Sequence, residues 1–200
     1  MRENTNYTGY FERLGSMSTN HISVEPIQNA EIADVVNLVK SSLDRYEEAG
    51  TVLASIYRRI QNFHSTYFNP YSFYLVARDL HSSRIIGGVG IGPLAGLPIS
   101  EGVGEIRELV IAPDYRGRGL GTRLLQECLK KGKKIGFKQI YLETTPQMEH
   151  AQKLFYRFGF RAVRHHTSGT PDVAVAEDLP FYFLLEDIDV GLSLRRVPSS

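Results

Sequence analysis

The stretch RGRGLGT, residues 116–122, follows the apolar run LVI of residues 109–111 through a short Pro-Asp-Tyr turn. It opens an amphipathic segment that carries Leu124, Leu125, Cys128 and Leu129 on one side. Alternating glycines let the main chain approach a ligand that side chains would keep away. The first N–H groups of a helix have no partner within the helix, and the helix dipole makes that end positive. The stretch therefore predicts a strand, a diphosphate-binding loop and a helix.

Two common nucleotide-binding loops do not fit this spacing. A dinucleotide fingerprint needs G-x-G-x-x-G, whereas the chain has Gly117-x-Gly119-x-Gly121. A P-loop needs a lysine and then Ser or Thr after the final glycine, and here Thr122-Arg123 follows Gly121. The pattern that remains is Arg-x-x-Gly-x-Gly over residues 116–121.

Two longer blocks resemble the GNAT superfamily of acyl-CoA-dependent N-acyltransferases. Residues 105–121, EIRELVIAPDYRGRGLG, are similar to the family's central strand and pyrophosphate loop. Residues 151–160, AQKLFYRFGF, are similar to its late helix and following strand. Residues 141–146, YLETTP, stand between them at the position of the fifth strand, so the blocks follow the family's order. The resemblance covers roughly residues 22–187.

Hydrophobic periodicity gives a matching order of elements. It predicts strands at 21–26, 72–78, 84–91, 105–111, 139–143, 160–164 and 181–186, and helices at 29–43, 51–63, 117–134 and 147–158. The short polar turn after residue 78 predicts an antiparallel hairpin, and the helix after residue 111 a parallel crossover. The predicted fold class is α/β (α+β), with helices on both faces of a mixed sheet. The resemblance implies a mostly antiparallel GNAT-type sheet, split at its parallel centre.

Length and composition set the limits of the interpretation. A chain of 200 residues fits one domain, which we place at 21–190. Residues 1–20 are predicted to be a disordered extension, or an appended segment ahead of a start at Met17, and 191–200 a flexible tail. The net charge of +1 provides no overall field to recruit nucleic acid or an anionic membrane.

The single cysteine and the apolar runs indicate a cytoplasmic location. Cys128 alone excludes an internal disulfide, and its place on an apolar helix stripe predicts a buried thiol. No apolar run approaches the roughly 18 residues of a membrane span. His165 and His166 have no third ligand at matching spacing, so no metal site is expected. We also expect no nucleic-acid or membrane partner, and leave open whether the chain forms a homodimer.

The resemblance implies acetyl-CoA as co-substrate and assigns its contacts. Main-chain groups of Leu109, Val110 and Ile111 would bind the pantetheine like an added strand. The diphosphate would lie on the N–H groups of Arg116, Gly117, Arg118, Gly119, Leu120, Gly121 and Thr122, with Arg116 and Arg118 adding charge. The Val110 N–H would stabilise the oxyanion that develops on the thioester carbonyl.

Two carboxylates compete for the role of general base. Glu105 stands at the family position of a base on the central strand, which often acts through water. Glu108 is the neighbouring candidate, but strict alternation turns it to the opposite face unless a bulge near Leu109 changes the parity. For each, the structural alternative is a half-buried carboxylate paired with Arg107 or another base.

The late helix departs from the family pattern. Many relatives have a tyrosine four residues before the glycine of the Gly-Phe pair, where it protonates the departing thiolate, and here that residue is Phe155. Tyr156 is the candidate acid instead, although a shift of one residue turns a helical side chain by about 100°. A thiol with a pKa of about 8.5 can also leave without an acid. Phe155 is then expected to pack against the pantetheine. Met148 replaces a frequent asparagine.

The acceptor is the open question. The first hypothesis is an N-acetyltransferase that moves an acetyl group from acetyl-CoA to a small-molecule primary amine by direct attack in a ternary complex. The alternatives are acetylation of a peptide N-terminus or lysine, and a CoA-binding module without turnover. Tyr67 and Phe68 either line an acceptor pocket or belong to the core, and for Phe73 we expect the core.

Overall fold

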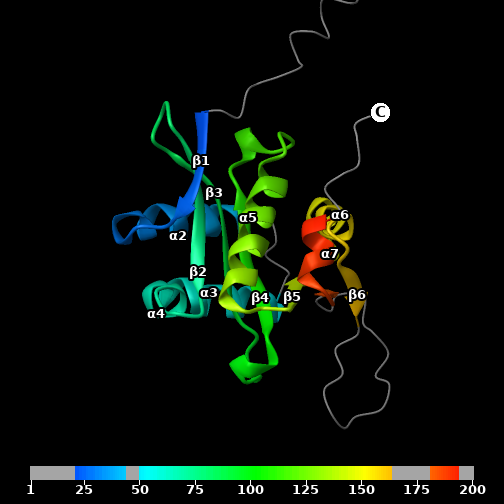
Figure 1. Cartoon of the computed structure of the whole chain (residues 1–200). Helices are drawn as coiled ribbons and strands as arrows, with labels where there is room; N and C mark the ends of the chain where they lie inside the picture. The colour runs from blue at the N-terminus through cyan, green and yellow to red at the C-terminus, as the bar shows by residue number, and fades with distance from the viewer. Residues whose placement is uncertain (1–20, 44–49, 164–180, 194–200) are drawn as a thin grey trace, which may run out of the picture.

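The computed structural model describes residues 21–43, 50–163 and 181–193 (Figure 1). These residues form a seven-stranded sheet in the order β1-β2-β3-β4-β5-β7-β6. The strands are β1 (Ile22–Pro26), β2 (Phe73–Asp79), β3 (Ile85–Pro93), β4 (Val103–Ile111), β5 (Gln139–Thr144), β6 (Arg161–Val163) and β7 (Phe181–Leu185). The helices are α2 (Ile32–Leu43), α3 (Gly50–Gln61), α4 (Phe63–Tyr67), α5 (Leu120–Ile135), α6 (Glu149–Arg157) and α7 (Ile188–Ser193). This confirms the predicted fold class.

The sheet is antiparallel at every described pairing except one. β2 and β3 form the predicted hairpin. β4 and β5 run parallel because α5 carries the chain back across the sheet between them. The parallel pair thus lies inside an otherwise antiparallel sheet, as the resemblance implied.

Strand alternation divides the interior into two cores. On β2, Phe73, Leu75 and Ala77 pack in a cluster with α5, whereas Tyr74 and Val76 pack with α2, α3 and α4. Successive side chains of a strand point to opposite faces, so α5 covers one face of the sheet and α2–α4 cover the other. Cys128 lies fully buried on the α5 side, where burial raises the pKa of its thiol. The prediction of a buried thiol is confirmed.

Some boundaries differ from the prediction. The first helical segment begins at residue 29 as predicted. Gln28 is its N-cap residue, and the main-chain N–H of Gln28 donates to the Glu31 carboxylate at 2.8 Å. The predicted second helix, 51–63, corresponds to α3, and a further short helix that was not predicted, α4, follows after Asn62. α7 reaches residues 191–193 of the expected tail, and Gly191 is buried. His165 and His166, residues 1–20 and residues 194–200 lie outside the described residues.

The parallel pair separates halfway along β4. Its ladder runs from Val103, opposite Gln139, to Ile106, opposite Leu142, and ends there although both strands continue. On its other side, β4 stays paired with β3 as far as Ile111. The register with β3 shifts between Gly88 and Gly90, where the chain of β4 contains one extra residue. β4 therefore leaves β5 at a bulge, and the segment 107–111 borders a gap.

Candidate active site

A cleft of about 900 Å³ opens where β4 and β5 separate. One wall is the unpaired part of β4, and the other is the end of β5 with α6. The glycine loop before α5 lines one part of it, and residues of α2 and α3 line another. The cleft thus extends from the start of α5 toward the helices on the opposite face of the sheet.

The glycine loop has the geometry expected of an anion cradle. Gly117 and Gly119 have φ values of +73° and +78°, and no heavy atom lies within 4 Å of a Cβ built on either. Leu120 begins α5 directly after Gly119, so the free N–H groups of a 16-residue helix point toward this open space. These features fit a bound diphosphate.

Most of the predicted CoA-binding residues line the cleft. They are Leu109, Val110, Ile111, Arg116, Gly117, Gly119, Leu120, Gly121, Thr122 and Phe155. Arg118 is not among the lining residues, and its guanidinium lies over the Tyr115 ring, 5.5 Å from the centroid. Arg116 donates from Nε to the Ile111 carbonyl at 3.0 Å, which ties the loop to the end of β4.

A second tie holds the turn before the loop. The Tyr115 hydroxyl donates to the Asp79 carboxylate at the end of β2, and the main-chain N–H of His81 donates to the same carboxylate at 2.9 Å. These hydrogen bonds, the one from Tyr115 first, lower the pKa of Asp79 to about 2. The loop is therefore anchored to the sheet by a carboxylate that stays ionised at neutral pH.

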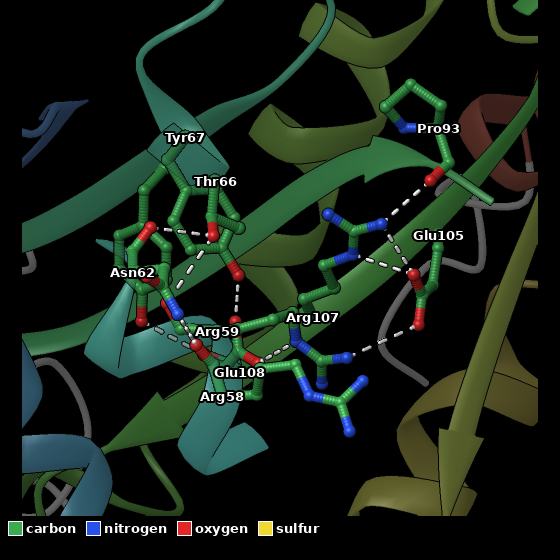
Figure 2. A network of polar contacts seen from close by, with 10 residues as sticks. Arg58, Arg59, Asn62, Thr66, Tyr67, Pro93, Glu105, Arg107 and Glu108 are labelled. Carbon is green, nitrogen blue, oxygen red and sulfur yellow. Dashed lines mark hydrogen bonds and ion pairs between the residues drawn. The ribbon is translucent and has the colours of Figure 1, made fainter. Parts of the chain in front are cut away.

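Glu105 lies in a polar network beside the cleft (Figure 2). Arg107 Nε donates to Glu105 Oε2 at 2.7 Å, and Arg59 Nη1 lies 3.8 Å from Glu105 Oε1. Arg107 also donates to the Pro93 carbonyl at 2.7 Å. The side chain of Glu105 is 10% exposed, and Glu105 is not among the residues that line the cleft.

Glu108 belongs to the same network but lies deeper. Its side chain is fully buried; Arg59 Nε donates to Oε1 at 2.5 Å, and the Tyr67 hydroxyl donates to Oε2 (Figure 2). Burial raises the pKa of Glu108 to about 7, against the lowering effect of Arg59. Strict alternation is broken by the bulge, so Glu108 shares the α3–α4 side of the sheet with Glu105.

On α6, the two aromatic residues predicted to take part in the site, Phe155 and Tyr156, point in different directions. Phe155 is buried, lines the cleft and packs against Phe160 and Phe183. Tyr156 is 54% exposed, meets the Phe183 ring edge-on and is not among the lining residues. The turn of one residue along the helix therefore takes the Tyr156 hydroxyl away from the cleft.

Sequence reasoning missed Arg59, and it left Tyr67 undecided. Both side chains reach β4 from helices far away in the sequence, which no local pattern reports. The signal that could have found Tyr67 is Gly-Gly-Val-Gly at residues 87–90 of β3, since glycines inside a strand mark a close approach. Among the described residues, no group of three or more His, Cys, Asp or Glu side chains could hold a metal ion.

Comparison with known proteins connects this geometry to a family. The model of the "Acetyltransferase (GNAT) family" matches residues 37–160. The "uncharacterized N-acetyltransferase YjgM" of Escherichia coli is 27% identical over 135 residues, which cover 68% of this chain and 77% of that protein. The "N-alpha-acetyltransferase 30" of Schizosaccharomyces pombe is 38% identical over 71 residues, 34% of this chain and 47% of that protein.

Solved structures agree on the fold. A GNAT-family acetyltransferase from Staphylococcus aureus superposes with a TM-score of 0.63 at 18% identity, over 82% of this chain and 97% of that one. An acetyltransferase from Streptococcus agalactiae gives a TM-score of 0.64 at 15% identity, over 82% and 98%. Within the described part of the chain, no helix is both long and apolar enough to cross a membrane.

Proposed function

Because this chain belongs to the GNAT acetyltransferase family and is an acyltransferase, we propose that it transfers the acetyl group of acetyl-CoA to a small-molecule primary amine. The transfer is a direct attack of the amine in a ternary complex. The observation that carries the proposal is the continuous cleft, which joins an anion cradle at α5 to the unpaired edge of β4.

The donor side of the cleft binds and orients. The N–H groups at the start of α5 hold the diphosphate, while the main chain of Leu109, Val110 and Ile111 pairs with the pantetheine amides. Arg116 adds a positive charge beside the diphosphate, and Phe155 supplies an apolar contact. The bound donor contributes an activated thioester, so the protein has mainly to supply proximity and a route for the proton.

The acceptor side handles the proton. Attack on the thioester carbonyl forms a C–N bond, breaks the C–S bond and leaves one proton in excess on the nitrogen. Glu105, whose side chain is 10% exposed beside the cleft, accepts that proton through water. The Val110 N–H stabilises the negative charge on the carbonyl oxygen. The thiolate leaves without a dedicated acid, because the Tyr156 hydroxyl lies outside the cleft.

The preference for a small acceptor rests on the wall opposite the loop. Val39 and Leu43 of α2 and Ile56 of α3 line the same cavity as the glycine loop. These apolar side chains favour a compact amine with an apolar body over an extended peptide backbone, which needs hydrogen-bonding partners. The names of relatives divide between the two classes: an "aminoalkylphosphonate N-acetyltransferase" stands beside "N-alpha-acetyltransferase 30".

The test is an acceptor panel read by the release of free thiol from acetyl-CoA. It contains small primary amines with and without apolar groups, and peptides with a free N-terminus or a lysine. We expect kcat/KM to be at least about 10-fold higher for an apolar amine than for any peptide. Turnover of peptides alone would replace the acceptor class. Acetyl-CoA binding without turnover of any amine would instead identify a CoA-binding module.

A further inference from the structure

The bulge of β4 holds one residue in an unfavourable backbone conformation. Glu108 has a φ of +42°, and Ser83 is the other non-glycine residue with a positive φ in the described part of the chain. Non-glycine residues rarely adopt a positive φ, so this backbone conformation persists only where the surrounding structure fixes it. In β4, this position lies directly before Leu109, in the part of the strand that is no longer paired with β5 and that lines the cleft.

Three groups from three different elements fix this residue. Arg59 of α3 and Tyr67 of α4 donate to its two carboxylate oxygens. The Tyr74 hydroxyl of β2 donates to its main-chain carbonyl at 3.0 Å. Hydrogen bonds therefore hold both the side chain and the main chain of Glu108. Together they fix the backbone geometry of the bulge, which apolar packing alone would not do.

Two glycines of β3 leave the space that the rings of Tyr74 and Tyr67 occupy. A Cβ on Gly88 would lie 2.4 Å from the Tyr74 ring, and a Cβ on Gly90 would lie 2.5 Å from the Tyr67 ring. The two rings also meet each other edge-on, with centroids 5.2 Å apart. Any larger residue at either position would displace a ring and its hydroxyl from Glu108.

Glu108 is among the residues that line the cleft, but its side chain is enclosed, so its carboxylate is placed to support the strand. Its side chain has no exposed surface, and both carboxylate oxygens are already engaged. A continuous series of contacts therefore leads from the two glycines of β3 through the tyrosine hydroxyls to Glu108. Glu108 directly precedes the main chain of Leu109, Val110 and Ile111.

We propose that Tyr67 and Tyr74 are positioning residues for acetyl-CoA: by holding Glu108, they fix the bulge that turns the main chain of residues 109–111 toward the cleft. This inference rests on the proposed use of that main chain to bind the pantetheine. Neither tyrosine is a catalytic residue, since each acts only through Glu108.

The test compares Tyr67→Phe and Tyr74→Phe with Tyr71→Phe, in which an exposed hydroxyl is removed from the same segment. Acetyl-CoA affinity is measured by calorimetry on the folded variants. We expect Kd to rise about 3- to 10-fold for the first two, the factor that one net hydrogen bond supplies, and to stay unchanged for the control. Gly90→Ala should resemble Tyr67→Phe, because it pushes the ring away.

A double-mutant cycle separates positioning from general packing. Glu108→Gly removes the carboxylate while glycine tolerates the positive φ. Since Tyr67 acts through Glu108, Tyr67→Phe should have no further effect on Kd in the Glu108→Gly background. Additive effects of the two changes would overturn the proposal.

A measurement without ligand keeps the inference apart from the proposed function. Amide hydrogen exchange of residues 109–111 should be faster in Tyr67→Phe and Tyr74→Phe than in the wild type and in Tyr71→Phe. Unchanged exchange together with an unchanged Kd would refute the positioning role. If the wild type bound no acetyl-CoA, the proposed function would fail, and altered exchange would still show that the tyrosines set the bulge.

Discussion

The two halves of β4 differ in their pairing: the first half has a neighbouring strand on both sides, and the second half has one only on the β3 side. Val103–Ile106 is paired with β5 on one side, and from Gly104 onward the strand is also paired with β3 on the other. Residues 107–111 remain paired with β3 but have lost β5, and they line the cleft. One extra residue at the bulge separates the halves. In a fully paired strand, the main-chain N–H and C=O groups form hydrogen bonds with the neighbouring strands. Where the pairing on one side ends, the groups on that side can form hydrogen bonds with a ligand.

The two glutamates of this strand repeat the contrast. Glu105, in the fully paired half, retains 10% side-chain exposure and takes part in ion pairs with Arg107 and Arg59. Glu108, at the bulge, is fully enclosed and held by two donors. We therefore retain Glu105 as the proposed base and Glu108 as the proposed support of the strand.

The largest effect is expected from a change at the anion cradle beyond the unpaired half. Gly119→Asp adds about 1–2 kcal/mol of left-handed backbone strain and a repulsion of about 4 kcal/mol between nearby like charges. We expect the Kd for CoA to rise at least about 1,000-fold by calorimetry. Gly96→Asp is the matched control, because Gly96 also has a positive φ in open space. Equal CoA affinity of Gly119→Asp and wild type would refute the cradle.

The fully paired half is tested at its carboxylate. Glu105→Gln retains shape and hydrogen bonding but cannot accept a proton, so kcat should fall about 100-fold, within the usual range for a general base. The Kd for acetyl-CoA should remain within about 2-fold of wild type. Glu101→Gln, at a glutamate of the exposed loop before β4, serves as the control. An intact kcat and pH profile in Glu105→Gln would remove Glu105 from the mechanism.

The buried carboxylate of Glu108, at the bulge, is tested through the pH dependence of the free energy of unfolding. The pKa of Glu108 is raised from 4.5 to about 7, which corresponds to roughly 3 kcal/mol. Between these values the unfolded chain has lost the proton while the folded chain retains it, so this contribution is present below pH 4.5 and is lost as pH rises to about 7. Denaturant titrations at pH 5 and 8 should show this fall for wild type but not for Glu108→Gln. Parallel pH profiles of the two proteins would contradict it.

The smallest effect is expected outside β4. Tyr156→Phe removes a hydroxyl that is not among the groups lining the cleft, and kcat should change by less than about 2-fold in the thiol-release assay. A loss of 10-fold or more would return the role of general acid to Tyr156.

Local patterns predicted most of the fold because they report directly on local structure. The hairpin of β2 and β3, the crossover through α5 and the buried Cys128 all follow from periodicity and turn residues. The glycine loop was predicted with its helix, since its spacing excluded the other phosphate loops. The conditional bulge near Leu109 is confirmed by the register shift.

The parts that escaped prediction depend on contacts across the sheet. Arg59 and Tyr67 reach Glu108 over sequence separations of 49 and 41 residues, so no window of sequence contains both partners. α7 lacks a long apolar stripe and depends on packing against α5. The position of Tyr156 could be doubted from helix geometry, but its exposure required the packing of α6 on the sheet.

Gly121 has a further consequence for the cleft. A Cβ at this position would lie 3.2 Å from Ile111 on one wall and 3.3 Å from Leu154 on the other. α5 is therefore a spacer whose thickness at residue 121 sets how far apart β4 and α6 can stand. A glycine there gives the narrowest spacing that a helix allows, and each added methyl group would wedge the walls apart. The width of the cleft beside the glycine loop thus depends on the absence of a side chain at residue 121.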